Sequence, residues 1–205
     1  MDHPKVSRLT AVAGLEIRRQ EAFALTANNV FDSTPLVVVE TMSKLPLRRE
    51  IRAAMERSLE PLVMDLACGT GGTIRDIKRE FPDLRMIGLD IRMDPSWKAR
   101  GSLHRDVRFI ESSFHQLLDK LPAGTIDLVY SHLGIRQSAN PENVLEQVFV
   151  VMKPEGRFLF DFGPKSTFCV PLDSKAAQLQ FLQTLQRIGF SPEQLKDDVF
   201  LAVKP

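Results

Sequence analysis

The sequence predicts an α/β protein built on a doubly wound, mostly parallel sheet with helices on both faces. Leu62–Leu66 is an apolar run interrupted only by Asp65, and its length suits a strand that is covered on both sides. A turn of small residues follows, and Ile74 and Ile77 then recur at helical spacing. Four more strands are predicted further along the chain, over residues 84–90, 107–110, 125–131 and 157–162.

The turn after the first strand is the most informative stretch of the chain. Ala67, Gly69, Gly71 and Gly72 carry almost no side-chain bulk, so this backbone turns sharply and lets a ligand approach its N–H groups closely. The helix that follows directs its N-terminus at whatever lies above the loop. With Asp65 at the strand end, the turn suits a ligand that carries an ammonium group or hydroxyl groups.

A second acid ends the next predicted strand. Residues 84–90 close with Asp90, and parallel strands end at the same edge of a sheet, so Asp65 and Asp90 are expected to flank one crevice. A carboxylate in that place accepts two hydrogen bonds from the vicinal hydroxyls of a ribose. The alternative is that Asp90 caps the next helix or pairs with Arg92.

The motif Asp65-x-Ala67-x-Gly69-x-Gly71 resembles the glycine motif of the class I S-adenosylmethionine-dependent methyltransferases, with alanine in the first small position. The resemblance extends over residues 60–205 and implies a seven-stranded, Rossmann-like sheet. The nearest competitor is the dinucleotide-binding fold, whose fingerprint is G-x-G-x-x-G. Ile74 stands at the third glycine position, which argues against a nicotinamide or flavin site.

The resemblance implies S-adenosylmethionine as the cofactor and assigns residues to it. Asp90 would bind the ribose, and Ile91 would lie against the adenine. The family commonly has an aspartate where Ser113 stands, and a serine hydroxyl accepts a hydrogen bond from the adenine amino group without a charge, at a cost of ~1 kcal/mol. The predicted cofactor-binding residues are Asp65, Ala67, Gly69, Thr70, Gly71, Asp90, Ile91, Ser113, Phe114 and Ser131.

The helix and strand after the fourth strand also follow the order of the family. Asn140 and Pro141 are predicted to cap and to start a helix. Lysine, proline and glycine at residues 153–156 then predict a turn that leads into the strand at residues 157–162. This unit of helix, turn and strand is fairly specific because its parts occur in a fixed order.

The end of the chain is predicted to close the sheet. Residues 190–195 and 199–203 are expected to form an antiparallel pair at its far edge, where Pro192 needs an edge position. A helix is predicted before them over Lys175–Ile188, and its inward residues are expected to be Leu179, Leu182, Leu185 and Ile188.

Residues 1–60 are predicted to form a helical lid or appendage to a core of residues 61–205. Amphipathic helices are predicted over residues 15–25 and 47–59, whereas residues 36–39 suit either a strand or the start of a buried helix. The apolar stripe of the second helix would consist of Leu47, Ile51, Ala54, Met55 and Leu59. Its cationic residues are Arg48, Arg49, Arg52 and Arg57, interpreted as a solvated face offset by Glu50 and Glu56, with a phosphate-binding patch as the alternative.

Methyl transfer from a sulfonium is an in-line displacement, and it depends on alignment in a water-poor cleft more than on a strong base. His132, directly after the fourth strand, is the best-placed residue to take a proton from a hydroxyl or amine, and it is the predicted catalytic residue. The alternative is a histidine hydrogen-bonded to the loop backbone. Cys68 and Cys169 belong to no metal-like cluster, so no metal is predicted.

The composition narrows the possible partners. The chain of 205 residues has a net charge of +1, so no global field attracts nucleic acid or anionic lipid. We expect no signal peptide and no membrane span, and two cysteines suit a reducing compartment, which places the protein in the cytoplasm.

The acceptor is narrowed by motifs that the sequence lacks. Ser131-His132-Leu133-Gly134 stands where an amino-group base methyltransferase would carry Asn/Asp-Pro-Pro-aromatic, and the surroundings of Cys169 do not match a cytosine-C5 enzyme. The expected acceptor is therefore a small molecule. A non-catalytic binding or scaffold protein remains an alternative because of Ser113, and a protein or RNA methyltransferase remains one because of the N-terminal arginines.

Overall fold

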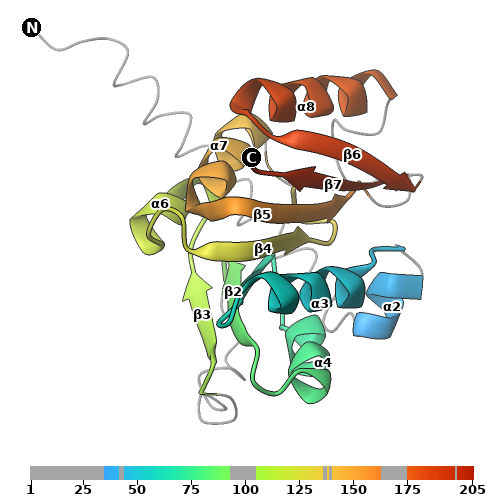
Figure 1. The fold of residues 1–205 in the computed structure, drawn as a ribbon. Helices are drawn as coiled ribbons and strands as arrows, with labels where there is room; N and C mark the ends of the chain where they lie inside the picture. Colours follow the sequence, from blue (N-terminus) through green and yellow to red (C-terminus); the bar gives the residue numbers. More distant parts are fainter. Residues whose placement is uncertain are drawn as a thin grey trace, which may run out of the picture.

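The computed structural model describes residues 35–41, 44–92, 105–135, 138, 140–162, 175–196 and 198–205. The helix predicted over residues 15–25 and the predicted role of Cys169 lie outside these residues. Within them, helices pack against both faces of one sheet (Figure 1).

The sheet contains seven strands in the order β3-β2-β1-β4-β5-β7-β6. The neighbouring pairs from β3 to β5 are parallel, and β7 runs antiparallel to both β5 and β6. The predicted α/β fold is thereby confirmed, including the antiparallel pair at the far edge (Figure 1). The strands are β1 Leu62–Leu66, β2 Arg85–Asp90, β3 Val107–Glu111, β4 Ile126–Ser131, β5 Met152–Asp161, β6 Ser191–Lys196 and β7 Val199–Val203.

Two hydrophobic cores lie on opposite faces of the sheet because side chains alternate along each strand. In β1, Val63 belongs to the core under α2, α3 and α4, whereas Met64 and Leu66 belong to the core under η1, α6, α7 and α8. The strands are therefore covered on both sides, as their continuous apolar runs predict. The helices are α2 Leu36–Thr41, α3 Leu47–Arg57, α4 Gly72–Glu80, η1 Phe114–Gln116, α6 Leu117–Lys120, α7 Pro141–Val151 and α8 Lys175–Ile188.

The predicted start of α7 is confirmed, but the predicted turn after it is wrong. Asn140 caps α7, because its side chain accepts a hydrogen bond from the Asn143 N–H at 3.3 Å, and Pro141 is the first helical residue. Strand β5 begins at Met152, so residues 153–156 lie inside the strand. The pairing of β5 with β4 shifts register between Ile126 and Leu128, which absorbs the irregular backbone there.

The inward faces of two helices differ in part from the predictions. In α8, Leu179 is 57% exposed, and Phe181 is buried in its place together with Leu185, four residues further on. Met55 is exposed within α3, and Leu59 is exposed because the helix ends at Arg57, before it. Residues 36–39 belong to α2, which decides between the two alternatives in favour of a helix.

Glu50 on α3 does not belong to a solvated face. Its side chain is buried, and its Oε2 accepts a hydrogen bond from Arg157 Nη1 of β5 at 2.7 Å. Its Oε1 accepts a second bond from Arg49 Nε at 2.9 Å. Since α3 packs over β4 and β5, this carboxylate joins the helix to the sheet from within the packed layer.

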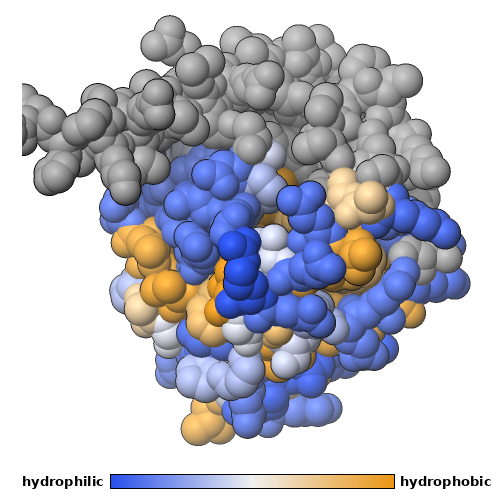
Figure 2. All heavy atoms as spheres, turned by 90° about the horizontal axis from the view of Figure 1, so that it is seen from above, coloured by the Kyte–Doolittle hydropathy of each residue, from blue (hydrophilic) through white to orange (hydrophobic). Residues whose placement is uncertain are grey.

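The surface seen from above is mostly hydrophilic where it belongs to the described residues, and its hydrophobic residues form separate small groups (Figure 2). That part of the surface presents no single large hydrophobic patch. Among the residues that the structure describes, none of the helices has the length and apolar composition needed to cross a membrane.

Candidate functional site

The glycine loop between β1 and α4 is open above its backbone. Ala67, Gly69 and Gly71 have φ angles of 77°, 52° and 70°, all in the left-handed region. A Cβ atom placed on Gly69 would meet no other atom within 4 Å, so a ligand has room to approach the chain at this residue. Helix α4 begins directly after the loop. Its N-cap residue is Gly71, so no side-chain hydrogen bond caps this end of the helix.

Asp90 at the end of β2 turns toward this loop. The Gly69 N–H donates a hydrogen bond to Asp90 Oδ2 at 2.8 Å, and the Arg92 N–H lies 3.4 Å from Oδ1. Burial raises the pKa of the Asp90 carboxyl, although the backbone N–H groups of Gly69, Arg92 and Ile91 act in the opposite direction. Arg92 contacts Asp90 through its backbone, so the predicted alternative of an ion pair between the two side chains is not what the structure shows.

Asp65 lies in β1 with one of its two carboxylate oxygens unsatisfied. The Tyr130 hydroxyl donates a hydrogen bond to Asp65 Oδ2 at 2.7 Å, and none of the described residues donates to Oδ1. Burial raises the pKa of the Asp65 carboxyl to about 7, and the bond from Tyr130 lowers it. Sequence reasoning missed this contact, because the β1–β4 register that pairs Asp65 with Tyr130 is known only from the structure.

The turn after β4 is fixed onto the glycine loop. Ser131 Oγ donates a hydrogen bond to the Leu66 carbonyl at 3.0 Å and accepts one from the Ile135 N–H at 3.1 Å. A Cβ atom on Gly134 would lie 2.4 Å from the Ala67 Cβ, so only glycine allows the two segments to approach this closely. The Ser131 hydroxyl is fully buried and holds this turn in place.

His132, in the same turn, is paired with a carboxylate. Its Nδ1 lies 2.7 Å from Asp161 Oδ2 at the end of β5, and the Leu133 N–H donates to Asp161 Oδ1 at 2.8 Å. The alternative that His132 bonds to loop backbone therefore does not hold. Asp161 was missed by sequence reasoning because the contact crosses from one strand end to the next.

Part of the chain is similar in sequence to a known family of proteins. Residues 63–156 match the family model described as "Methyltransferase domain". Residues 63–156, just under half of the chain, are thus similar to a methyltransferase domain.

Individual relatives of the domain are moderately similar. Sterol 24-C-methyltransferase of Aspergillus fumigatus is 31% identical over 101 residues, and demethylmenaquinone methyltransferase of Thermus thermophilus is 30% identical over 127 residues. These alignments cover 47% and 59% of this chain but only 26% and 56% of the two relatives. A solved S-adenosylmethionine-dependent methyltransferase from Aquifex aeolicus has the same fold, with a TM-score of 0.56 at 16% identity, over 77% of this chain and 92% of that chain.

Ser113 and Phe114 are buried where the chain passes from β3 into η1. The Ser113 hydroxyl accepts a hydrogen bond from the His115 N–H at 3.3 Å and so caps η1. Phe114 packs into the core under α6 and α7. Thr70 on the glycine loop and Ile91 after β2 are partly exposed. The structure thus leaves the cofactor roles predicted for these four residues as predictions.

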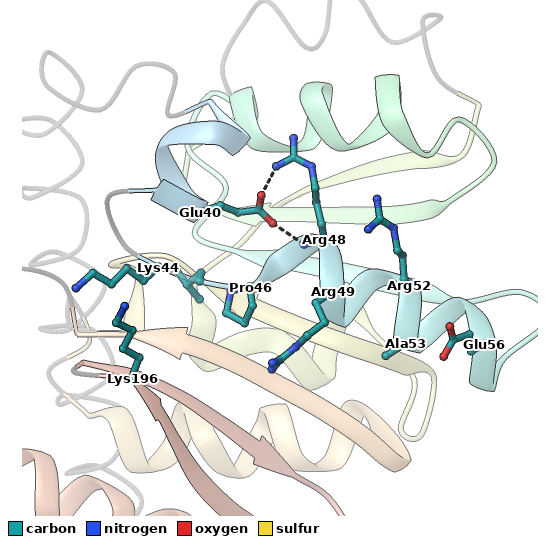
Figure 3. Close-up of a pocket in the computed structure, with 10 residues that line it drawn as sticks. Glu40, Lys44, Pro46, Arg48, Arg49, Arg52, Ala53, Glu56 and Lys196 are labelled. Atoms are coloured by element: carbon teal, nitrogen blue, oxygen red, sulfur yellow. Dashed lines mark hydrogen bonds and ion pairs between the residues drawn. The ribbon is translucent and has the colours of Figure 1, made fainter.

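A separate open pocket of about 720 Å³ lies beside α3, and none of the predicted cofactor-binding residues lines it (Figure 3). Its arginines are paired with glutamates: Arg48 with Glu40 and Glu80, Arg52 with Glu80, and Arg49 with Glu50. Figure 3 shows Arg49 pointing away from Arg48 and Arg52. The cations do not converge on one point, which favours paired surface charges over a phosphate cradle. The pocket is lined by Glu40, Lys44, Leu45, Pro46, Arg48, Arg49, Arg52, Ala53, Glu56 and Lys196.

Among the residues that the structure describes, no group of three or more His, Cys, Asp or Glu residues could hold a metal ion. The prediction of a metal-free site stays a prediction. Burial raises the pKa of the Cys68 thiol, and the neighbouring carboxylates of Asp65 and Asp90 raise it further, which disfavours the thiolate that a metal would need.

Replacing Ala67 by glycine is expected to stabilise the domain by about 1 kcal/mol, because an L-residue in the left-handed region costs ~1–2 kcal/mol and the greater freedom of unfolded glycine offsets part of this gain. Urea denaturation of both proteins measures the difference. Ala53→Gly in α3 is the matched control and is expected to destabilise by about 1 kcal/mol. Destabilisation by both substitutions would contradict the strain assigned to Ala67.

Proposed function

We propose that the protein binds S-adenosylmethionine and transfers its methyl group to an oxygen or nitrogen nucleophile of a small molecule. The observation that carries the proposal is the open glycine loop with one acid on each side of it. Among the described residues, none fills the space above Gly69 and none donates a hydrogen bond to the second oxygen of the buried Asp65, while Asp90 accepts one from the Gly69 N–H. A buried, unsatisfied carboxylate oxygen is costly unless a ligand supplies a donor.

The residues present fit this cofactor. In this proposal Asp90 would accept hydrogen bonds from the two ribose hydroxyls, and Asp65 would accept one from the ammonium group. The N-terminus of α4 would face the carboxylate, since helix N-termini favour negative charge. When bound, S-adenosylmethionine supplies a methyl group on a positively charged sulfur, which keeps the electron pair of the carbon–sulfur bond. The protein then has to align the acceptor and exclude water.

We infer that the acceptor is a small molecule and that the protein acts in the cytoplasm. Arg48, Arg49 and Arg52 on α3 are paired with glutamates, which weighs against a basic surface for a nucleic-acid acceptor. The names of the relatives range from a sterol and a demethylmenaquinone methyltransferase to a tRNA methyltransferase, so the relatives leave the acceptor open.

Calorimetric titration with S-adenosylhomocysteine tests the cofactor. We expect saturable binding, and we expect Asp90→Ala to weaken it at least tenfold, because a good pair of charge-assisted hydrogen bonds is worth about 1.5–3 kcal/mol. Asp119→Ala on α6 is the matched control, since Asp119 is exposed and far along the chain from the glycine loop. Folded protein that shows no heat of binding up to millimolar ligand would overturn the proposal.

A binding protein without turnover is the second candidate. The Ser113 hydroxyl already accepts a hydrogen bond from the His115 N–H, so its capacity to recognise adenine is partly used. Tight cofactor binding without methyl transfer to any member of a broad panel of hydroxyl, amine and thiol acceptors would favour this candidate.

A further inference from the structure

The His132–Asp161 pair has the geometry of an oriented base. Asp161 is 1% exposed at the end of β5, and both of its oxygens accept hydrogen bonds, Oδ2 from His132 Nδ1 and Oδ1 from the Leu133 N–H. A carboxylate only accepts hydrogen bonds, so the proton of a neutral His132 ring lies on Nδ1. Nε2 then carries the lone pair, and none of the described residues bonds to Nε2.

The backbone around His132 is held in place on both sides. Ser131 fastens the turn to the Leu66 carbonyl and the Ile135 N–H, and Leu133 is held at φ 61°. Gly134 packs against Ala67 of the glycine loop with no room for a side chain. A ring fixed by a rigid turn and a buried carboxylate is pre-organised for proton transfer, because little reorganisation is needed when the proton moves.

We propose that Asp161 is a positioning residue that holds His132 with Nε2 toward the acceptor, and that the acceptor of the proposed methyl transfer carries a hydroxyl group. This inference rests on the proposed function. His132 Nε2 takes the hydroxyl proton while the electron pair of that O–H bond stays on oxygen, which forms the new bond to the methyl carbon. Asp161 balances the charge of the protonated ring, and the proton then leaves His132 for solvent.

A hydroxyl acceptor is favoured over an amine by this arrangement. A neutral amine attacks with a lone pair that it already has, whereas a phenol-like hydroxyl has a pKa of about 10 and needs a base near neutral pH. Among the described residues, the ionisable groups shown to act on His132 are Asp161 from β5 and Asp65 from β1, which interacts with it electrostatically. Tyr130 from β4 is hydrogen-bonded to Asp65 and so belongs to the same cluster.

The test is a ¹⁵N NMR titration of the histidine rings with no acceptor present, with His132 assigned from its loss in His132→Gln. The neutral His132 ring is expected to carry its proton on Nδ1. S-adenosylmethionine should lower the titration midpoint of His132 by about one pH unit or more relative to S-adenosylhomocysteine, since the two differ by one positive charge close to Nε2. His115 is the control, because its ring bonds to Asn143 and Ser138 and should titrate alike with both ligands.

Asp161→Asn is the second arm of the test. It should lower the His132 midpoint and mix the two ring tautomers, because the amide no longer balances the charged ring. A proton on Nε2 in the wild-type protein, or equal His132 midpoints with two ligands that both bind, would overturn the inference alone. If neither ligand binds by calorimetry, the proposed function fails and the inference fails with it. The wild-type measurements stand even if Asp161→Asn does not fold.

Discussion

Raising the pH from 4 to 8 is expected to destabilise the protein through Asp65, and Asp65→Asn is expected to remove most of that loss. Burial raises the pKa of this carboxyl from 3.8 to about 7. The folded state therefore holds a proton that the unfolded state releases above pH 4. The stability that this proton contributes is complete below the unfolded pKa and is lost as the pH rises through 7. A shift of this size corresponds to about 4 kcal/mol.

Urea denaturation of wild-type and Asp65→Asn proteins at intervals between pH 4 and 8 measures this effect. An asparagine oxygen still accepts the hydrogen bond from Tyr130, so the variant keeps the contact and loses the titration. The variant should gain stability relative to the wild type as the pH rises, whereas Asp119→Asn on α6 should not. Curves for wild type and Asp65→Asn that run parallel over this range would refute the assignment.

The strands and the glycine loop could be predicted because their signals are local. The apolar run Leu62–Leu66 has the same bounds as the observed strand β1. The small residues at 67, 69 and 71 all take the left-handed backbone conformation of the turn. Asn140 before Pro141 predicted the start of α7 for a similar reason, since a cap acts on the adjacent turn of the helix.

The contacts that complete the site could not be predicted, because each joins residues that only the sheet brings together. Tyr130 reaches Asp65 across the β1–β4 register, and Asp161 reaches His132 from the end of the next strand. The exposed Leu179 has a related cause. A repeat of apolar residues defines a helix well, but which side of α8 faces the core depends on where the helix lies on the sheet.

Glu50 is the clearest case in which a local pattern misleads. A glutamate among arginines on an amphipathic helix usually indicates a solvated face, but the partner that draws this one inward is Arg157, 107 residues away. Glu50 is 1% exposed, whereas the Arg157 side chain is 30% exposed. The buried Glu50 therefore needs Arg157 as a partner more than Arg157, which reaches solvent, needs Glu50.

This inequality predicts unequal costs for removing each partner. Arg157→Met leaves the Glu50 carboxylate buried with Arg49 as its remaining partner, so we expect a loss of about 3 kcal/mol in the free energy of unfolding. Glu50→Gln leaves the partly exposed Arg157 able to reach water and should cost about 1–2 kcal/mol. Both values come from urea denaturation at pH 7.

The double variant Glu50→Leu/Arg157→Met decides whether the pair stabilises the fold or only avoids a buried unpaired charge. Replacing both members of a buried ion pair by apolar residues is often close to neutral, so we expect the double variant to recover most of the stability that Arg157→Met loses. Arg85→Met is the control, since Arg85 pairs with Glu60 at an exposed position and should cost less than about 1 kcal/mol. If the double variant is as unstable as the sum of Glu50→Leu and Arg157→Met, each made alone, then Glu50 and Arg157 do not act as a pair, and each holds α3 on the sheet through separate contacts.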